Sequence, residues 1–151
     1  MPKILLVDDE ERLRTMLSRI LRDAGYTVNC FENGKDAIKA SYKELYNIAL
    51  IDIQLPDMQG TELLTKLRKT EPEIIKIIIT GHATLDSAVD AANKGVDGYI
   101  TKPFRADKLL EMMETQLRKQ SVQIEIDEQK VAEYIAARHE WMSNASIQNK
   151  K

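Results

Sequence analysis

Five polar residues stand at the ends of sequence segments that have the pattern of buried strands. They are Asp8, Asp9, Asp52, Thr80 and Lys102. In open α/β sheets, ligands bind in the crevice beyond the carboxyl ends of the strands. We therefore expect three carboxylates, one hydroxyl and one ammonium group to meet at a single edge of a sheet.

Three carboxylates beside a lysine suit a divalent cation and a phosphoryl group. Mg2+ prefers oxygen ligands and keeps several of its waters, so it binds to one or two carboxylates next to a phosphate; Mn2+ is the alternative ion. The cation offsets the mutual repulsion of the acids, so that Asp52 can attack phosphorus in line. Lys102 would neutralise one phosphoryl oxygen and Thr80 would donate a hydrogen bond to another, without a histidine base.

Each of these residues also has an ordinary explanation when it is taken alone. An acidic pair in front of a helix, such as Asp8 and Asp9, more often caps that helix than binds a metal. Asp52 also fits the role of an ordinary loop acid, and Thr80 fits that of a hydroxyl bonded to nearby backbone. Lys102 fits the role of a solvated surface charge. Their joint placement after successive strands favours phosphoryl chemistry.

The positions of these residues depend on five apolar runs that alternate with helical patterns. The runs are Ile4 to Val7, Tyr26 to Phe31, Ile48 to Ile51, Ile74 to Ile79 and Gly98 to Ile100. Such alternation predicts an α/β fold with a doubly wound parallel sheet. The second run alternates apolar with polar residues and the fifth is short, so we expect these two strands at the edges.

Apolar residues at helical spacing predict a helix after each strand. The first helix carries Leu13, Met16, Leu17, Ile20 and Leu21 and ends near Gly25. The second begins near Gly34, the third stops before Pro72, and the fourth runs from about Thr84 to Lys94. Leu109, Leu110, Met113 and Leu117 form the buried face of the fifth.

The overall composition excludes several classes of partner. The chain has 151 residues, 22 basic against 24 acidic, which leaves no broad basic surface for DNA or for an anionic membrane. No apolar stretch approaches the roughly 20 residues of a membrane span. Cys30 is the only cysteine, and no secretory leader pattern is present, so we expect a cytoplasmic protein.

Taken in order, the motifs resemble the receiver domains of two-component response regulators. The likeness rests on Asp8-Asp9, on Asp52 with Pro56 and Gly60 after it, on Thr80-Gly81, and on the segment from Tyr99 to Phe104. It covers about residues 1–120, which we expect to form the receiver domain, followed by an extension over 121–151. The resemblance implies a flavodoxin-like sheet of five strands in the order 2-1-3-4-5.

The resemblance also assigns roles to individual residues. Asp52 would accept the phosphoryl group, while Asp8, Asp9 and the backbone carbonyl of Gln54 would join it in binding the metal. Thr80 and Tyr99 would form a switch pair that remodels the face made by the fourth helix, fifth strand and fifth helix. The bond between Lys102 and Pro103 would be cis. Gln54 and His82 would flank the phosphoryl group and modulate its lifetime, or merely line a solvated rim.

The extension has two competing patterns. Leu110, Leu117, Ile124 and Val131 recur every seventh residue with Met113, Tyr134 and Trp141 on an adjacent line, which predicts a prolonged fifth helix with coiled-coil character. Gln120 and Asp127 interrupt the second line. Val122, Ile124 and Ile126 also alternate like a short strand, and the chain from Ser143 onward has the composition of a frayed end. The extension would pair two copies, dock on another protein, or fold back on its own domain.

The sequence therefore predicts a single-domain response regulator rather than an enzyme. A histidine kinase or phosphotransfer protein would be the phosphodonor, and an unidentified downstream protein would receive the output. One alternative is a phosphatase similar to haloacid dehalogenases, whose second acid lies two residues after the nucleophile; here Asp9 follows Asp8 directly and position 10 is Glu10. Another is an interaction module that does not depend on phosphorylation. Flavin binding is disfavoured by the acidic first strand-to-helix turn.

Overall fold

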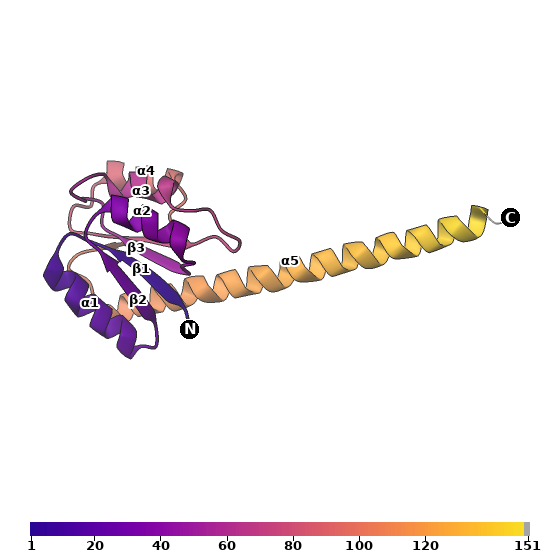
Figure 1. The fold of residues 1–151 in the computed structure, drawn as a ribbon, viewed down its shortest axis with the longest axis horizontal. Helices are drawn as coiled ribbons and strands as arrows, with labels where there is room; N and C mark the ends of the chain where they lie inside the picture. Colours follow the sequence, from indigo (N-terminus) through magenta and orange to yellow (C-terminus); the bar gives the residue numbers. More distant parts are fainter. Residues whose placement is uncertain (150–151) are drawn as a thin grey trace. The chain divides into compact units, whose positions relative to one another are not determined.

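The computed structural model describes the backbone of residues 1–149 and the side chains of residues 1–145. Strands and helices alternate along these residues (Figure 1). The strands are β1 Lys3–Val7, β2 Thr27–Phe31, β3 Ile48–Ile51, β4 Ile75–Thr80 and β5 Gly98–Thr101. The helices are α1 Glu11–Asp23, α2 Gly34–Lys43, α3 Gly60–Lys66, α4 Leu85–Asn93 and α5 Ala106–Asn149.

All five strands are parallel and form one sheet in the order β2-β1-β3-β4-β5. The predicted doubly wound fold and strand order are thus confirmed, with β2 and β5 at the edges. Val7 pairs with Ile51, and Thr80 pairs with Thr101. This register brings the carboxyl ends of the strands, with the polar residues that follow them, to a common edge.

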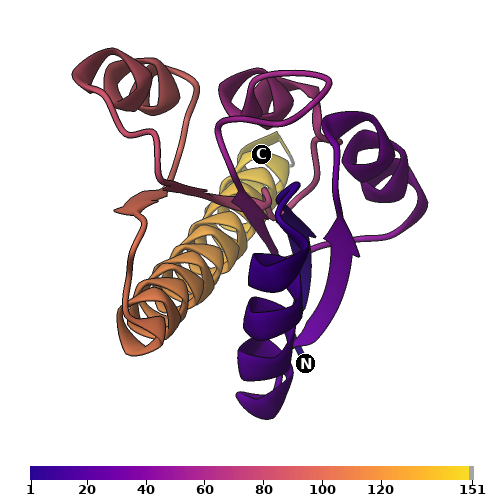
Figure 2. The ribbon, with the colours of Figure 1, turned by 90° about the vertical axis from the view of Figure 1, so that its left-hand side faces the viewer.

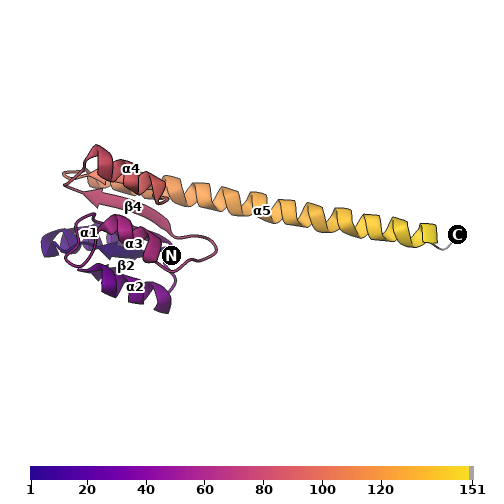
Figure 3. The same cartoon turned by 90° about the horizontal axis from the view of Figure 1, so that it is seen from above.

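Helices cover both faces of the sheet. The view in Figure 2 shows α1 and the first turns of α5 on one face, and α2, α3 and α4 on the other. Figure 3 shows α3 between α4 and α2, in agreement with the contacts between these neighbours. The central strands β1, β3 and β4 therefore carry almost continuous apolar sequence, because both of their faces are buried.

Several strand ends differ by one residue from those expected from hydropathy. β4 runs from Ile75 to Thr80 rather than from Ile74 to Ile79, because backbone pairing with β5 extends to Thr80. α3 ends at Lys66, before Pro72 as predicted, and Leu67 at its C-cap is buried. Hydrogen-bonding partners, which a hydropathy pattern does not contain, set these ends.

The chain divides into two compact units, Met1–Gln116 and Leu117–Lys151. In the second unit α5 stays helical as far as Asn149, so the extended alternative for the segment from Val122 to Ile126 is wrong. Every side chain from Ser121 to Asn144 is exposed. Lys150 and Lys151, where the expected fraying would be greatest, lie outside the described residues. Within residues 1–149, no helix combines the length and apolar character that crossing a membrane requires.

Candidate phosphoryl-accepting site

Two adjacent strands bring the acids together. Asp8 follows β1 and Asp52 follows β3, and the backbone N–H of Asp52 donates a 3.0 Å hydrogen bond to the carbonyl of Val7. Asp8 and Asp52 are buried, whereas Asp9 is exposed. One carboxylate oxygen from each of the three lies within 4.8 Å of the others. The acids that the sequence placed at separate strand ends therefore form one cluster.

Lys102 joins the cluster from the end of β5. Its Nζ donates a 2.9 Å hydrogen bond to Oδ2 of Asp8 and a 3.0 Å hydrogen bond to Oδ2 of Asp52, and Glu10 Oε2 lies 4.0 Å away. Only 19% of the lysine side chain is exposed, so the interpretation as a solvated surface charge is wrong. The peptide bond between Lys102 and Pro103 is cis.

Burial and pairing oppose each other in this cluster. Burial raises the pKa of Asp8, and the hydrogen bonds from Lys102 and from the Glu10 backbone offset part of that rise. Burial acts to lower the pKa of Lys102, but its hydrogen bonds to Asp8 and Asp52 outweigh this effect, and the pKa of Lys102 is raised. The lysine is thus held as a cation between two carboxylates.

The acidic pair does not cap α1. Glu10 is the N-cap residue of this helix, and no side chain makes the capping hydrogen bond. Oδ1 of Asp8 instead accepts the backbone N–H of Glu10 at 2.8 Å, and the guanidinium of Arg14 donates to the Asp8 carbonyl at 2.7 Å. These contacts orient the Asp8 carboxylate toward Lys102 and leave the Asp9 side chain exposed.

The loop after β3 is packed tightly against Asp52. The backbone N–H of Gln54 donates to Oδ1 of Asp52 at 3.2 Å, and the backbone N–H of Gly60 donates to the Ile53 carbonyl at 2.6 Å. A Cβ atom on Gly60 would lie 2.0 Å from the carbonyl oxygen of Asp52. Glycine is therefore required here by the close approach of two backbone segments.

Thr80 and Tyr99 lie near this cluster but do not line its pocket. Thr80 is fully buried, and its hydroxyl accepts the backbone N–H of His82 at 3.1 Å. Tyr99 is partly buried against the hydrophobic core, and its hydroxyl shares a 3.0 Å hydrogen bond with Ser87 of α4. The expected convergence of five polar groups thus holds for the three acids and the lysine, while the threonine is fully buried and does not line the pocket.

A pocket of about 310 Å³ opens above the acids. It is lined by Asp9, Glu10, Asp52, Gln54, Gly81, His82 and Lys102. Gln54 and His82, which the sequence singled out as flanking positions, thus both reach its wall. The pocket gives a small anionic group access to the carboxylate of Asp52.

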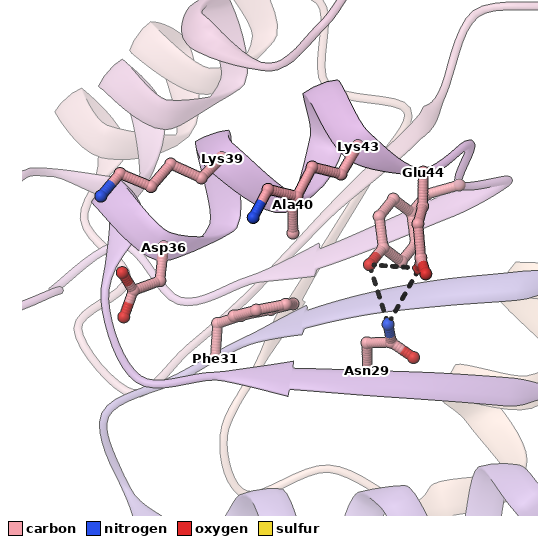
Figure 4. Close-up of a pocket in the computed structure, with 8 residues that line it drawn as sticks. Asn29, Phe31, Asp36, Lys39, Ala40, Lys43 and Glu44 are labelled. Atoms are coloured by element: carbon pink, nitrogen blue, oxygen red, sulfur yellow. Dashed lines mark hydrogen bonds between the residues drawn. The ribbon is translucent and has the colours of Figure 1, made fainter.

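A second crevice, which we call the α2–β2 crevice, has a volume of about 370 Å³ (Figure 4). In Figure 4 the side chain of Asn29 points toward Glu44, and its amide donates to the carboxylate of Glu44 at 3.2 Å and to the Tyr46 hydroxyl at 3.0 Å. Lys3 forms an ion pair with the same carboxylate. The polar groups on this side of the crevice are thus bonded to one another.

Asp57 has a structural role that the sequence did not reveal. Its two carboxylate oxygens accept the backbone N–H groups of Gly34 and Lys35 at 2.8 and 2.9 Å, at the start of α2. Slight burial raises the pKa of Asp57, but these backbone donors outweigh it and hold the pKa below its ordinary value. The two partners lie more than twenty positions upstream, so no local pattern marks this contact.

Comparison with known proteins gives one consistent result. A family model described as "Response regulator receiver domain" matches residues 4–114. The DNA-binding transcriptional regulator NtrC of Escherichia coli is 36% identical over 111 residues, which is 74% of this chain and 24% of that relative. The chain therefore spans about a quarter of the length of this curated relative.

Solved structures show the same likeness. The crystal structure of a CheY-like receiver domain protein from Methanospirillum hungatei has 38% identity and a TM-score of 0.78, with 82% of this chain and 98% of that chain covered. The solution structure of a beryllofluoride-activated NtrC4 receiver domain dimer has 29% identity and a TM-score of 0.74, with 80% and 99% covered.

Proposed function

The chain belongs to the response regulator receiver domain family, and we propose on this basis that it is a switch controlled by phosphorylation of Asp52. Receiver domains are signalling modules whose general function is phosphorylation on an aspartate. The observation that carries the assignment to Asp52 is the contact of Lys102 with both Asp8 and Asp52, at the edge of the sheet where a pocket opens. We assign the receiver domain to residues 1–120 and a separate extension to residues 121–151.

The acidic cluster fits a small divalent cation. Two oxygens bound to one Mg2+ at about 2.1 Å lie at most about 4.2 Å apart, and the three carboxylates already offer oxygens within 4.8 Å of one another. Three acids face one lysine, so negative charge remains for a cation to offset. We assign Mg2+, or Mn2+, to Asp8, Asp9, Asp52 and the backbone carbonyl of Gln54. The ion would neutralise phosphoryl oxygens as they approach.

The transfer requires one bond to form and one to break. A carboxylate oxygen of Asp52 attacks phosphorus, and the bond from phosphorus to the donor's histidine nitrogen or acetate oxygen breaks, with its electron pair leaving on the donor. Lys102 moves its Nζ from Asp52 to a phosphoryl oxygen and keeps its hydrogen bond to Asp8. The backbone N–H of Gln54, already on Oδ1 of Asp52, holds the carboxylate in place.

The switch proposal rests on the present partners of Thr80 and Tyr99. The Thr80 hydroxyl would exchange the backbone N–H of His82 for a phosphoryl oxygen, and would then donate rather than accept. The Tyr99 hydroxyl would leave Ser87 on α4 as its ring turns inward. Both exchanges alter the face formed by α4, β5 and the first turns of α5. We assign Gln54 and His82 to the rim that controls water access to the phosphoryl group.

We assign a histidine kinase or phosphotransfer protein as the donor and a protein, rather than DNA, as the target of the output. In the extension, Lys130, Arg138, Lys150 and Lys151 are outnumbered by five acidic residues. The single cysteine, Cys30, is compatible with a reducing compartment, and we place the protein in the cytoplasm.

Labelling with acetyl phosphate and Mg2+ tests the assignment. We expect one phosphoryl adduct on the parent protein by intact mass, none on Asp52→Asn, and an unchanged adduct on Asp57→Asn, which alters an exposed acid in the same loop. Omission of Mg2+ should abolish labelling. Equal labelling of the parent and Asp52→Asn would overturn the role of Asp52. Sustained release of phosphate would favour the phosphatase alternative.

A further inference from the structure

The second unit exposes apolar side chains on one face of α5. Eight large apolar residues between Ser121 and Asn144 are exposed, and six of them share this face. The six are Ile124, Val131, Tyr134, Ile135, Trp141 and Met142. An isolated helix gains nothing from such a face, since most helical stability comes from burying it against a partner.

Two lines of residues with a seven-residue repeat run along this face, and together we call these two lines the seam. The first line is Leu117, Ile124, Val131, Arg138 and Ala145; the second is Gln120, Asp127, Tyr134 and Trp141. Asp127 in the second line and Arg138 in the first are the only charged members. Charged residues within an apolar seam select the register and orientation of helix pairing. The reason is that a charge buried in the interface without an opposite charge beside it raises the free energy of the pair.

Neither charge is neutralised within its own helix. Asp127 and Arg138 are eleven positions apart, which is about 17 Å along a helix at 1.5 Å per residue. Asp127 accepts a hydrogen bond from Gln123, and Arg138 donates one to the Tyr134 hydroxyl at 3.3 Å. Among the described residues, neither takes part in an ion pair. Both charges are therefore available to a partner that approaches the seam.

A parallel pairing of two copies is disfavoured by these charges. In a parallel dimer with both chains in register, each seam residue faces its own counterpart. Asp127 would then lie against Asp127 of the second copy and Arg138 against Arg138. Like charges in direct contact across an interface disfavour that arrangement strongly.

An antiparallel pairing removes both conflicts at once. When Asp127 faces Arg138 of a second copy, the register of the whole seam follows, because the two helices advance in opposite directions by equal steps. Val131 then faces Tyr134, and Ile124 faces Trp141. A shift by one heptad in either direction places Asp127 opposite Val131 or opposite Ala145. Only the register with Asp127 opposite Arg138 therefore pairs opposite charges, and it also pairs aliphatic with aromatic residues.

The flanking positions are compatible with the same register. Lys130 lies beside Ala137 of the second copy, and Glu128 lies beside Ile135. No like-charged pair is created there. We propose that the segment from Leu117 to Ala145 pairs with the same segment of a second copy as an antiparallel coiled coil, held in register by two Asp127–Arg138 ion pairs. This dimer does not depend on phosphorylation of Asp52.

Disulfide trapping in the full chain tests the direction of pairing. In a Cys30→Ser background, we expect a mixture of Ile124→Cys and Trp141→Cys chains to yield a cross-linked heterodimer on mild oxidation. Each variant alone should yield little, because its two cysteines lie about 25 Å apart along the antiparallel pair. Efficient cross-linking of Ile124→Cys with itself, and none in the mixture, would overturn the antiparallel arrangement.

Charge reversal tests the register. We expect Asp127→Arg and Arg138→Asp each to raise the dimer dissociation constant at least about tenfold, and the double variant to restore most of the parent affinity. A parallel dimer predicts no such rescue. Glu125→Arg makes the same change of charge outside the seam and serves as the control, with less than about a twofold effect.

Sedimentation equilibrium on these proteins gives decisive outcomes. Concentration-dependent dimers with rescue by the double variant support the proposal. A parent that stays monomeric up to about 1 mM, whether its seam is free or folded on its own domain, overturns it. Acetyl phosphate labelling of the same samples separates the two proposals, because the charge-reversal variants should label at the parent rate even where they no longer dimerise.

Discussion

Two polar crevices in the first unit differ in how their acids are paired with positive charge. In the α2–β2 crevice, the carboxylate of Glu44 is shared by Lys3, Asn29 and Tyr46. At the carboxyl edge of the sheet, one lysine is shared by two buried acids, with a third acid exposed beside them. Glu44 thus has three side-chain donors for one carboxylate, whereas the cluster of three acids has one lysine.

This difference has a chemical consequence. An acid with several donors is stabilised as a carboxylate, and indeed the hydrogen bond from Lys3 holds the pKa of Glu44 below its ordinary value. Asp8 is in the opposite position, since burial raises its pKa despite Lys102. A site that lacks positive charge has capacity for a cation and for the reaction that the cation assists. The number of polar groups in a pocket is therefore less informative than their balance of charge.

The largest effect should come from a comparison of two lysines, one paired with Asp8 and Asp52 and the other paired with Glu44. Lys102→Met removes the cation that would contact a phosphoryl oxygen, so we expect the rate of acetyl phosphate labelling to fall about 100-fold. Lys3→Met should leave that rate unchanged. Stopped samples quantified by intact mass measure both. Similar rates for the two variants would remove the distinction between the crevices.

Gly60→Ala should disturb the support of Asp52. The added methyl group would lie 2.0 Å from the Asp52 carbonyl oxygen, and the clash is with backbone. We expect the free energy of unfolding to fall by about 2 kcal/mol in urea titrations, with slower labelling. In Gly81→Ala the new atom would meet only the Lys102 side chain at 3.8 Å, and a loss of stability as large as that of Gly60→Ala would contradict the steric argument.

Asp57→Ala should weaken the start of α2 without affecting the chemistry. The loss of two acceptors for the N–H groups of Gly34 and Lys35 should lower the free energy of unfolding by about 1 kcal/mol at neutral pH. The pKa of Asp57 is lowered in the folded state, so its contribution is present above the ordinary pKa and is lost as pH falls through the folded value. The difference between parent and variant should therefore shrink in acid; a constant difference would point to another cause.

Asn29→Ala should have the smallest effect. Asn29 lies on the edge strand β2, and its amide donates hydrogen bonds to Glu44 and to Tyr46. In the variant the carboxylate of Glu44 keeps Lys3 as a partner. We expect a loss of about 0.5 kcal/mol in the free energy of unfolding and no change in labelling rate. A slowed labelling rate would show that the α2–β2 crevice influences Asp52, and the two crevices would then not be independent.

Much of the site could be predicted because strand ends are local features. The apolar runs before Asp8 and Asp52 show where each strand stops, and parallel strands bring their ends to one edge. The bidentate contact of Lys102 could not be predicted, because it depends on the reach of a side chain across two neighbouring strands. The contact of Asp57 with the start of α2 was missed because its partners are distant in sequence. Gly60 was recognised as part of the motif, but its close approach to the Asp52 carbonyl was not predicted, because it is a contact between two backbone segments.

By itself, the sequence determined the order of strands and helices, the doubly wound class of fold and the identity of the polar residues at the strand ends. Hydrophobic periodicity and turn residues are properties of short segments of the chain, so these features can be predicted without information on distant contacts. Only the tertiary structure decided which acids share Lys102, and that Thr80 is fully buried and does not line the pocket. These outcomes depend on register, burial and competing backbone hydrogen bonds, which exist only once separate segments have been brought together.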